Sequence, residues 1–340
     1  MALFFSGATS AIVRAQSETP SVTPDPFPAY TNDNTPTFTG TAIGSGAPIR
    51  RVEYRVDSGD WIGITEPNGA KPVDGDWNEL SEDYIFTTAT LSDGLHTVEV
   101  RAIDSAEYTT PPDNYAITTF TVEHDNPSVT IVPLSPDPTN DPTPTLTGTA
   151  TDVTSPITSV EYRVGSGDWI AAEAIDGAFD STSETYTFTT ATLANGQHTV
   201  QVKAKDAADN WTAADNYASD IFTVDTTAPS VTIADIPSFV NALASISGTA
   251  YDASPGGLDR VQIVINNNTD GTYWDSSIWN NTKTWLDATG TTTWNYSMPT
   301  LTNGTDYTVK ARSIDTAGNI SIEASDSFAF DTMSPPTPSL

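Results

Sequence analysis

The sequence contains no cysteine and only three histidines in its 340 residues. The absence of cysteine excludes disulfides, zinc–thiolate sites, iron–sulfur clusters and thiol catalysis. Three histidines leave few groups for a metal or acid–base centre. No run approaches the roughly 18 apolar residues of a membrane span, and no stretch shows the 3.6-residue period of an amphipathic helix.

Basic residues are also scarce, with 13 Lys and Arg against 44 Asp and Glu, which gives a net charge of −31. Such a charge repels the phosphates of nucleic acids and of anionic membranes, so we expect no nucleic-acid partner and no direct membrane insertion. It favours divalent cations and cationic partners. The 12 Phe, 12 Tyr and 8 Trp residues supply enough aromatic bulk for several small cores, which excludes wholesale disorder.

One sequence unit occurs three times. The segment Pro-Ser-Val-Thr recurs at positions 20, 127 and 229, which are 107 and 102 residues apart, and Gly-Thr-Ala recurs at 40–42, 148–150 and 248–250. The predicted division is a leader, residual signal segment or donor strand at 1–19, domains at 20–126, 127–228 and 229–333, and a linker or start of a next contact at 334–340.

Each unit consists of short alternating runs separated by turn residues. Val160, Tyr162 and Val164 recur at every second position, the period of a half-buried strand, and residues 165–168 then form a turn. About seven strands per unit with frequent turn signals are typical of an antiparallel sandwich. The sequence therefore predicts an all-β fold: three tandem antiparallel β-sandwiches that form an elongated rod, roughly 100 Å long or more at ~3.3 Å per strand residue.

The units resemble the bacterial Ig-like, fibronectin III-like modules of extracellular surface proteins and adhesins. The motifs that carry the resemblance are Gly-Thr-Ala at 148–150, Leu-x-x-Gly-x-His-Thr-Val at 193–200 and Val-Asp-Thr-Thr-Ala-Pro at 224–229, and it extends from about residue 20 to residue 333. The resemblance implies that the three domains are tandem Ig-like antiparallel β-sandwiches and that the protein is exported to a prokaryotic cell surface. It does not specify a function, since such modules serve adhesins, enzyme spacers, surface layers and virion proteins alike.

His96, His198 and Tyr307 occupy one shared position in the three units, eight residues before an aspartate. A shared position indicates a shared role. We therefore expect corner residues that hydrogen-bond locally, and no catalytic histidine.

The acidic residues support a more specific hypothesis about the joins between units. The last strand of a seven-stranded sandwich ends at the pole where the linker meets two loops of the following unit. At the second join this brings together Asp225, Asp252, Asp315 and Asn319. At the first join it brings Glu123 or Asp125 toward Asp152, Asp206, Asp209 and Asn210.

Carboxylates crowded at one point repel one another unless a cation lies between them. Ca²⁺ takes six to eight oxygen ligands, whereas Mg²⁺ demands a tighter octahedron and retains its water. We therefore expect Ca²⁺ at one or more joins and no other cofactor. The alternative is that Asp and Asn occupy these loops because they cap turns by bonding to their own backbone.

The third unit is unusually rich in tryptophan and asparagine. Aromatic faces beside amides are typical of sugar-binding surfaces, so Trp274, Trp279 and Trp285 are candidate carbohydrate-binding residues. The alternative is that Trp274 and Trp294 belong to the core of an enlarged sandwich. Glycosylation sequons, which arise by chance in such a chain and matter only in a host that glycosylates, occur at Asn210, Asn267, Asn280, Asn295, Asn303 and Asn319.

The first sixteen residues have two interpretations. They resemble the tail end of a secretion signal with a cleavage site at residues 13–15, or they form an apolar strand that completes a sheet edge in a neighbouring subunit. The residues that would make this assembly contact are Leu3, Phe4, Phe5, Ile12 and Val13.

Enzyme chemistry has no support in the sequence. The motifs G-x-S-x-G and H-E-x-x-H and the phosphate-binding loop are absent, and the carboxylates are too numerous to nominate a pair. We expect a non-enzymatic extracellular structural or adhesive protein: a subunit of a surface filament or surface layer, or an adhesin stalk. Its partners would be copies of itself, neighbouring surface proteins or glycans. The alternative function is a carbohydrate-binding surface module in the third domain.

Overall fold

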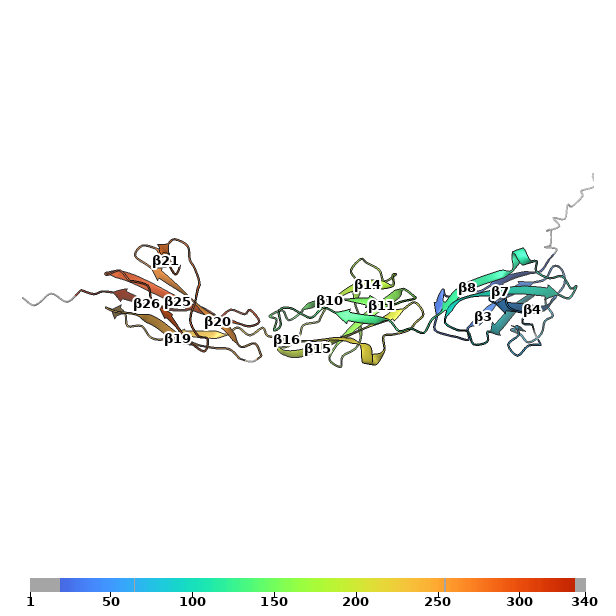
Figure 1. The fold of residues 1–340 in the computed structure, drawn as a ribbon, viewed down its shortest axis with the longest axis horizontal. Helices are drawn as coiled ribbons and strands as arrows, with labels where there is room; N and C mark the ends of the chain where they lie inside the picture. Colours follow the sequence, from blue (N-terminus) through green and yellow to red (C-terminus); the bar gives the residue numbers. More distant parts are fainter. Residues whose placement is uncertain (1–18, 64, 254, 334–340) are drawn as a thin grey trace, which may run out of the picture.

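The computed structural model describes residues 19–63, 65–253 and 255–333, and within them the chain forms three β-sandwiches in a row. Figure 1 shows the sandwiches end to end in an extended rod, so the predicted fold class is confirmed. The helical segments of this described part are two 3₁₀ turns, η1 (Pro112–Asn114) and η2 (Ala214–Asn216). Neither is long or apolar enough to cross a membrane. The assembly residues Leu3, Phe4, Phe5, Ile12 and Val13, and the segment 334–340, lie outside the described residues.

The first sandwich has two four-stranded sheets. One sheet has the order β1 (Ser21–Pro24), β3 (Thr37–Ile43), β6 (Ser81–Thr87) and β5 (Lys71–Pro72). The other has the order β2 (Tyr30–Thr31), β8 (Ala116–Val122), β7 (Gly94–Asp104) and β4 (Ile49–Val56). Pairing is antiparallel except for β2 with β8, which is parallel.

The second sandwich repeats this plan. One sheet has the order β9 (Ser128–Ile131), β10 (Thr145–Thr151), β14 (Ser183–Thr189) and β13 (Glu173–Ala174). The other has the order β12 (Ile170–Ala171), β11 (Ile157–Val164), β15 (Gly196–Asp206) and β16 (Ala218–Val224).

The third sandwich has a smaller first sheet and an enlarged second sheet. The first contains β17 (Ser230–Ile233), β19 (Ser245–Tyr251) and β24 (Thr293–Ser297). The second contains β18 (Phe239–Val240), β26 (Ala324–Phe330), β25 (Thr305–Asp315), β20 (Leu258–Asn267), β21 (Thr272–Trp274) and β22 (Trp279–Asn280), with β23 (Leu286–Asp287) paired to β20.

The recurring glycine of the Gly-Thr-Ala motif has a packing cause. Gly148 lies opposite the fully buried Tyr186 across β10 and β14, and a Cβ on Gly148 would be 2.1 Å from the Thr130 carbonyl oxygen and 2.3 Å from the Tyr186 hydroxyl. The first and third sandwiches repeat the arrangement, the third with Trp294 over Gly248. Trp294 is 2% exposed, so its interpretation as a core residue is correct.

Candidate functional site

The linker acids are positioned by backbone hydrogen bonds at the end of each sandwich. Residues 123–127 connect β8 to β9, and residues 225–229 connect β16 to β17. The Glu123 N–H donates to the Thr31 carbonyl at 3.0 Å, and the Asp225 N–H donates to the Thr139 carbonyl at 2.9 Å. Each acid therefore extends the last strand by one residue and places its side chain at the pole that faces the next sandwich.

At the second join, three carboxylates from two sandwiches converge. Asp225, Asp252 and Asp315 each offer an oxygen that lies within 4.8 Å of the other two. Asp225 is fully buried and Asp315 is 2% exposed. The Asn319 side-chain amide connects the two sandwiches, because it donates to the Asp225 carbonyl at 2.7 Å and to Asp315 Oδ2 at 2.8 Å. The structure thus brings together all four residues that the sequence predicts here.

Gly256 allows the close approach of the linker acid. Its N–H donates to Asp225 Oδ2 at 2.7 Å, and a Cβ at this position would lie 2.1 Å from that oxygen. On the other side, the Asn195 amide donates to Asp225 Oδ1 at 3.3 Å. These neutral contacts were missed by the sequence reasoning, which considered only oxygen ligands.

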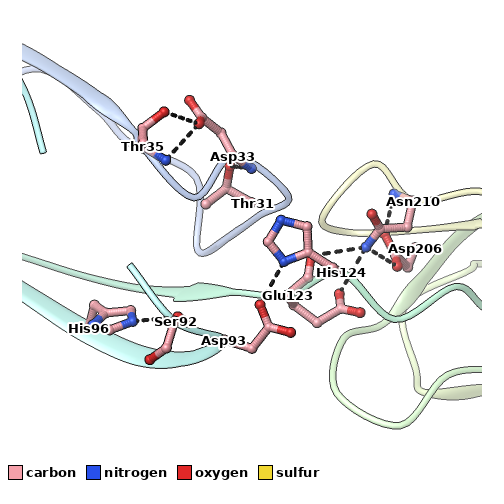
Figure 2. Close-up of polar contacts among 10 residues, drawn as sticks. All are labelled: Thr31, Asp33, Thr35, Ser92, Asp93, His96, Glu123, His124, Asp206 and Asn210. Carbon is pink, nitrogen blue, oxygen red and sulfur yellow. Dashed lines mark hydrogen bonds and ion pairs between the residues drawn. The ribbon is translucent and has the colours of Figure 1, made fainter. Parts of the chain in front are cut away.

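The first join has the same plan with a glutamate as the linker acid. Glu123, Asp152 and Asp206 offer oxygens within 4.8 Å of one another; Glu123 and Asp206 are buried and Asp152 is half-buried. Figure 2 shows the Asn210 amide between Glu123 and Asp206, where it donates to the Glu123 carbonyl at 3.1 Å and to Asp206 Oδ2 at 3.0 Å. The fully buried Ser155, which the sequence reasoning also missed, donates its hydroxyl to Glu123 Oε2 at 3.1 Å.

Two acids predicted for the first join lie elsewhere. Of the alternatives Glu123 and Asp125, the structure places Glu123 in the cluster and leaves Asp125 exposed on the linker. The prediction for Asp209 is wrong. This residue has a left-handed backbone (φ 70°), and its carboxylate binds Lys205 Nζ at 2.8 Å on the surface.

The crowding changes the proton affinity of these acids. Burial, followed by the charges of Asp206 and Asp152, raises the pKa of Glu123 to about 7, and the Ser155 hydroxyl only partly opposes this. Burial raises the pKa of Asp206, and burial together with Asp225 and Asp315 raises the pKa of Asp252. Within the described residues, Glu123 Oε1 and Asp252 Oδ1 are buried without any hydrogen-bond partner.

These features fit a hard cation. Oxygens in one Ca²⁺ shell lie at most about 5 Å apart, twice the 2.3–2.6 Å Ca–O distance, and each triad meets this limit. A cation would also give the unpartnered Glu123 and Asp252 oxygens the partner that a buried carboxylate oxygen requires. The candidate ligands are therefore Glu123, Asp152 and Asp206 at the first join and Asp225, Asp252 and Asp315 at the second, with Asn210 and Asn319 bracing the two triads.

The shared position of the histidines has the predicted corner role. His96 Nε2 contacts the Ser92 carbonyl at 2.7 Å, as Figure 2 shows, and His198 Nε2 contacts the Ala194 carbonyl at 2.8 Å. In the third sandwich the Tyr307 hydroxyl accepts from the Thr302 N–H at 2.9 Å. The local hydrogen bonds that the sequence predicts are confirmed.

The tryptophans of the third sandwich differ in exposure and in partners. Trp274 and Trp279 are partly buried and pack against the third core, with ring centroids 5.6 Å apart. Trp285 lies against two cations, with Arg312 Cζ 4.2 Å and Lys283 Nζ 4.8 Å from its ring centroid. Trp274 and Trp279 thus contribute to the packing of the core, whereas Trp285 packs against the cationic side chains of Lys283 and Arg312.

The sequon asparagines are not equally accessible. Asn210 is 8% exposed and Asn267 is 4% exposed, so the folded chain cannot carry a glycan on either. The Asn319 amide is part of the second join. Asn280 donates to Asp275 Oδ2 at 2.7 Å, and Asn303 Oδ1 accepts from the Thr332 N–H at 2.6 Å. Asn295 lies exposed on β24.

The fold and the joins define a tandem array of Ig-like sandwiches linked by acidic junctions. Residues 182–333, which comprise the end of the second sandwich and the whole third, match the family model of the bacterial Ig-like domain (group 3). The match confirms the resemblance drawn from the motifs. Domains of this family are typical of surface proteins, and Ig-like folds are generally non-catalytic.

Solved structures with a similar fold have low sequence identity. The fibronectin(III)-like modules of CbhA from Clostridium thermocellum are 18% identical over 60% of this chain and 93% of theirs, with a TM-score of 0.36. A three-domain segment of titin is 13% identical over 93% of this chain and 100% of its own, with a TM-score of 0.37. A domain of intimin is 14% identical over 61% of this chain and 99% of its own, with a TM-score of 0.26. The comparison with curated proteins gave no match.

Proposed function

We propose that this chain is a non-enzymatic rod of the prokaryotic cell surface, in which Ca²⁺ at two joins holds three Ig-like sandwiches in line. Such a rod serves as a filament subunit, a surface-layer component or an adhesin stalk. The observation that carries the proposal is the convergence of three carboxylates from both neighbouring sandwiches at each join, with an unpartnered buried oxygen in each triad.

The proposed cation connects the sandwiches because its ligands come from both of them. Asp225 follows the last strand of the second sandwich. In the third sandwich, Asp252 directly follows β19 and Asp315 is the last residue of β25. Without a cation, repulsion among the acids opposes the hydrogen bonds that cross the join, and the linker bends more readily. With a cation, bending breaks ligand bonds, so the join becomes stiff.

The shape of the full chain in solution tests this proposal. Small-angle X-ray scattering in Ca²⁺ is expected to give one extended particle, and scattering in chelator a shorter average maximum dimension with a broader distribution. The variant that combines Asp225→Ala with Glu123→Gln is expected to behave in Ca²⁺ as the wild type does in chelator. Asp209→Ala, which removes an exposed acid outside the triads, is the matched control and is expected to respond as wild type. A calcium-independent shape for all three proteins contradicts the proposal.

The proposed partners are copies of the chain itself or neighbouring surface proteins. The sequence-predicted donor strand lies in residues 1–19, so deletion of these residues tests assembly separately from the joins. Electron microscopy of both forms gives the answer: loss of polymers on deletion supports a filament, and monomeric rods in both forms rule it out in favour of a stalk or spacer.

A further inference from the structure

The scarce basic residues gather on one sheet of each sandwich. Among the described residues, every Lys and Arg except Lys71 lies on or beside the sheet that contains β4, β11 or β20. Several of them lie against indole rings, namely Arg55 and Arg101 on Trp61, Arg163 and Lys203 on Trp169, Lys203 and Lys205 on Trp211, and Lys283 and Arg312 on Trp285. The net charge of −31 conceals this local concentration.

In the first sandwich the guanidinium groups are neutralised by the sheet itself. Glu53 lies opposite Arg101 and accepts from its Nη2 at 2.7 Å, and Glu99 lies opposite Arg55 and accepts from its Nε at 2.5 Å. Although burial opposes ionisation, Arg51 and Arg101 lower the pKa of Glu53. Trp61 covers both pairs, with Arg101 Cζ 3.9 Å from its ring centroid. Glu53 also accepts from Arg51 Nε at 2.7 Å, so each of these three guanidinium groups has a carboxylate partner.

In the second sandwich a neutral amide replaces one of these carboxylates. Gln201 holds the position of Glu99, opposite Arg163. Its Oε1 accepts from Arg163 Nε at 3.0 Å and from Nη2 at 2.7 Å, and Arg163 has no carboxylate within ion-pair distance in the described residues. Arg163 Cζ lies 4.6 Å from the Trp169 ring centroid, and both side chains are half-buried.

The third sandwich has the same replacement on the other strand. Gln262 holds the position of Glu53, opposite Arg312, and accepts from its Nε at 3.0 Å and its Nη2 at 2.7 Å. No carboxylate of the described chain forms an ion pair with Arg312. Burial, together with the charge of Arg260, lowers the pKa of Arg312, although Glu323 partly opposes this. Its Cζ lies 4.2 Å from the Trp285 ring centroid.

We propose that Arg163 with Trp169, and Arg312 with Trp285, are two binding sites for the carboxylate of a uronic-acid sugar. In each site a neutral glutamine oxygen holds the Nε and Nη2 side of the guanidinium, so a ligand carboxylate would bind at Nη1, beside the adjacent indole ring. The first sandwich shows that this arrangement tolerates a carboxylate beside each arginine, since Glu99 and Glu53 occupy there the positions of Gln201 and Gln262. The high negative charge of the whole chain opposes long-range attraction of polyanions, so the ligand is recognised at short range, one carboxylate at a time.

The sites are independent of the proposed cation joins, and the test separates them. An oligogalacturonate is titrated into the full chain by calorimetry in the presence of chelator, because Ca²⁺ would itself bind the carboxylates of both partners. The fully methyl-esterified oligomer is the control ligand, since it retains the sugar rings and lacks the charges. We expect binding of the acid and at least a tenfold weaker association of the ester, as for the loss of a charge-assisted hydrogen bond of about 1.5–3 kcal/mol.

The variants Gln201→Glu and Gln262→Glu provide the sharpest arm of the test, because they supply each site with its own carboxylate in nearly the same volume. Each is expected to remove one site, and the double variant to bind oligogalacturonate at least tenfold more weakly. Gln201→Glu is expected to leave the melting temperature unchanged or raised, whereas Gln262→Glu loses the hydrogen bond that Gln262 Nε2 donates to Asp287 Oδ1 at 2.9 Å and is expected to lower it. Glu99→Gln, which recreates the open arrangement in the first sandwich, is expected to add a site. Equal binding of acid and ester, or unchanged binding by the double variant, overturns the proposal. A third result also overturns the proposal: oligogalacturonate does not bind, and the chain associates with itself in a salt-sensitive way that the double variant abolishes. The carboxylate that binds each arginine would then belong to a second copy of the chain.

Discussion

The two joins use the same number of acids but stabilise them differently. At the second join, Asn195 accepts the Thr226 N–H at 3.0 Å and donates to Asp225, and Gly256 donates to the same carboxylate, so neutral donors hold the linker acid in place. At the first join the equivalent position of Asn195 is Asp93, which pairs with the exposed His124 at 2.6 Å and leaves Glu123 Oε1 without a partner (Figure 2). Neutral donors therefore hold the linker acid at the second join, whereas at the first join the linker acid itself has a raised pKa.

The largest expected effect concerns the linker acid of the second join. Asp225→Ala is expected to remove most of the increase in melting temperature that Ca²⁺ produces, because it deletes a buried ligand that bridges two sandwiches. An ion at a hundred times its dissociation constant contributes ~2.7 kcal/mol, or several degrees in a domain of this size. Calorimetry in Ca²⁺ and in chelator measures the difference. An unchanged calcium response in Asp225→Ala, with a normal response of the Asp209→Ala control, would show that the ion binds elsewhere.

The second prediction tests the difference between the joins through Gly256, a neutral residue that only the second join has. Gly256→Ala is expected to reduce stability by about 1–3 kcal/mol and to weaken the calcium response, because the added Cβ displaces Asp225 Oδ2. Gly63→Ala is the matched control, since its Cβ would meet ordinary contacts no closer than 3.5 Å. Chemical denaturation in Ca²⁺ and in chelator measures both effects. Equal stability losses in the two variants would contradict this account of the join.

The third prediction concerns the proton response of the first join. The pKa of Glu123 is raised from 4.5 to about 7 in the folded chain, so the folded state holds a proton that the unfolded state has released. In chelator, stability is therefore expected to fall as the pH rises from about 4.5 to 7, by roughly 1–3 kcal/mol. Denaturation at pH 5 and pH 7.5 measures the loss. Glu123→Gln is expected to flatten much of it. The Asp206 and Asp252 carboxyls, whose pKa values are also raised, supply a remainder of the same sign. If Glu123→Gln loses as much stability between pH 5 and pH 7.5 as the wild type does, Glu123 is not the cause of the pH dependence.

The smallest expected effect lies next to the first join. Although burial opposes it, hydrogen bonds to the Ser92 carbonyl and to Asp57 raise the pKa of His96. This pair contributes stability that is complete below pH 6.5 and is lost as the pH rises through the folded pKa. Asp57 is half-exposed, so the contribution is expected to stay under about 1 kcal/mol. Titration of the His96 ring by NMR should show its pKa fall toward 6.5 in Asp57→Asn; an unchanged pKa would exclude Asp57 as a cause.

The sequence predicted those parts of the molecule that depend on repetition and alternation. The period of the Gly-Thr-Ala motif and the alternation at Val160, Tyr162 and Val164 were sufficient for the sandwiches, and strand order was sufficient to bring Asp225 to Asp252 and Asp315. Gly256, Ser155 and Asn195 escaped because their contribution is a neutral hydrogen bond that only the three-dimensional approach of two sandwiches creates.

Two other features depend on geometry that composition does not contain. Asp209 was assigned to the join because it lies near Asp206 in sequence, but its left-handed backbone turns the side chain to Lys205. The difference between Glu99 and Gln201 looks conservative in the sequence. The strand register shows why this difference matters, because it places Glu99 and Gln201 each opposite an arginine.

The measurement that tests the central claim most directly is a pair of melting curves of the unmodified chain, one in Ca²⁺ and one in chelator, at neutral pH. The account predicts that Ca²⁺ raises the melting temperature by several degrees, since an ion at each join offsets most of the charge of a largely buried triad of carboxylates. Identical curves in the two conditions would contradict it, and the acidic joins would then be turns capped by their own backbone.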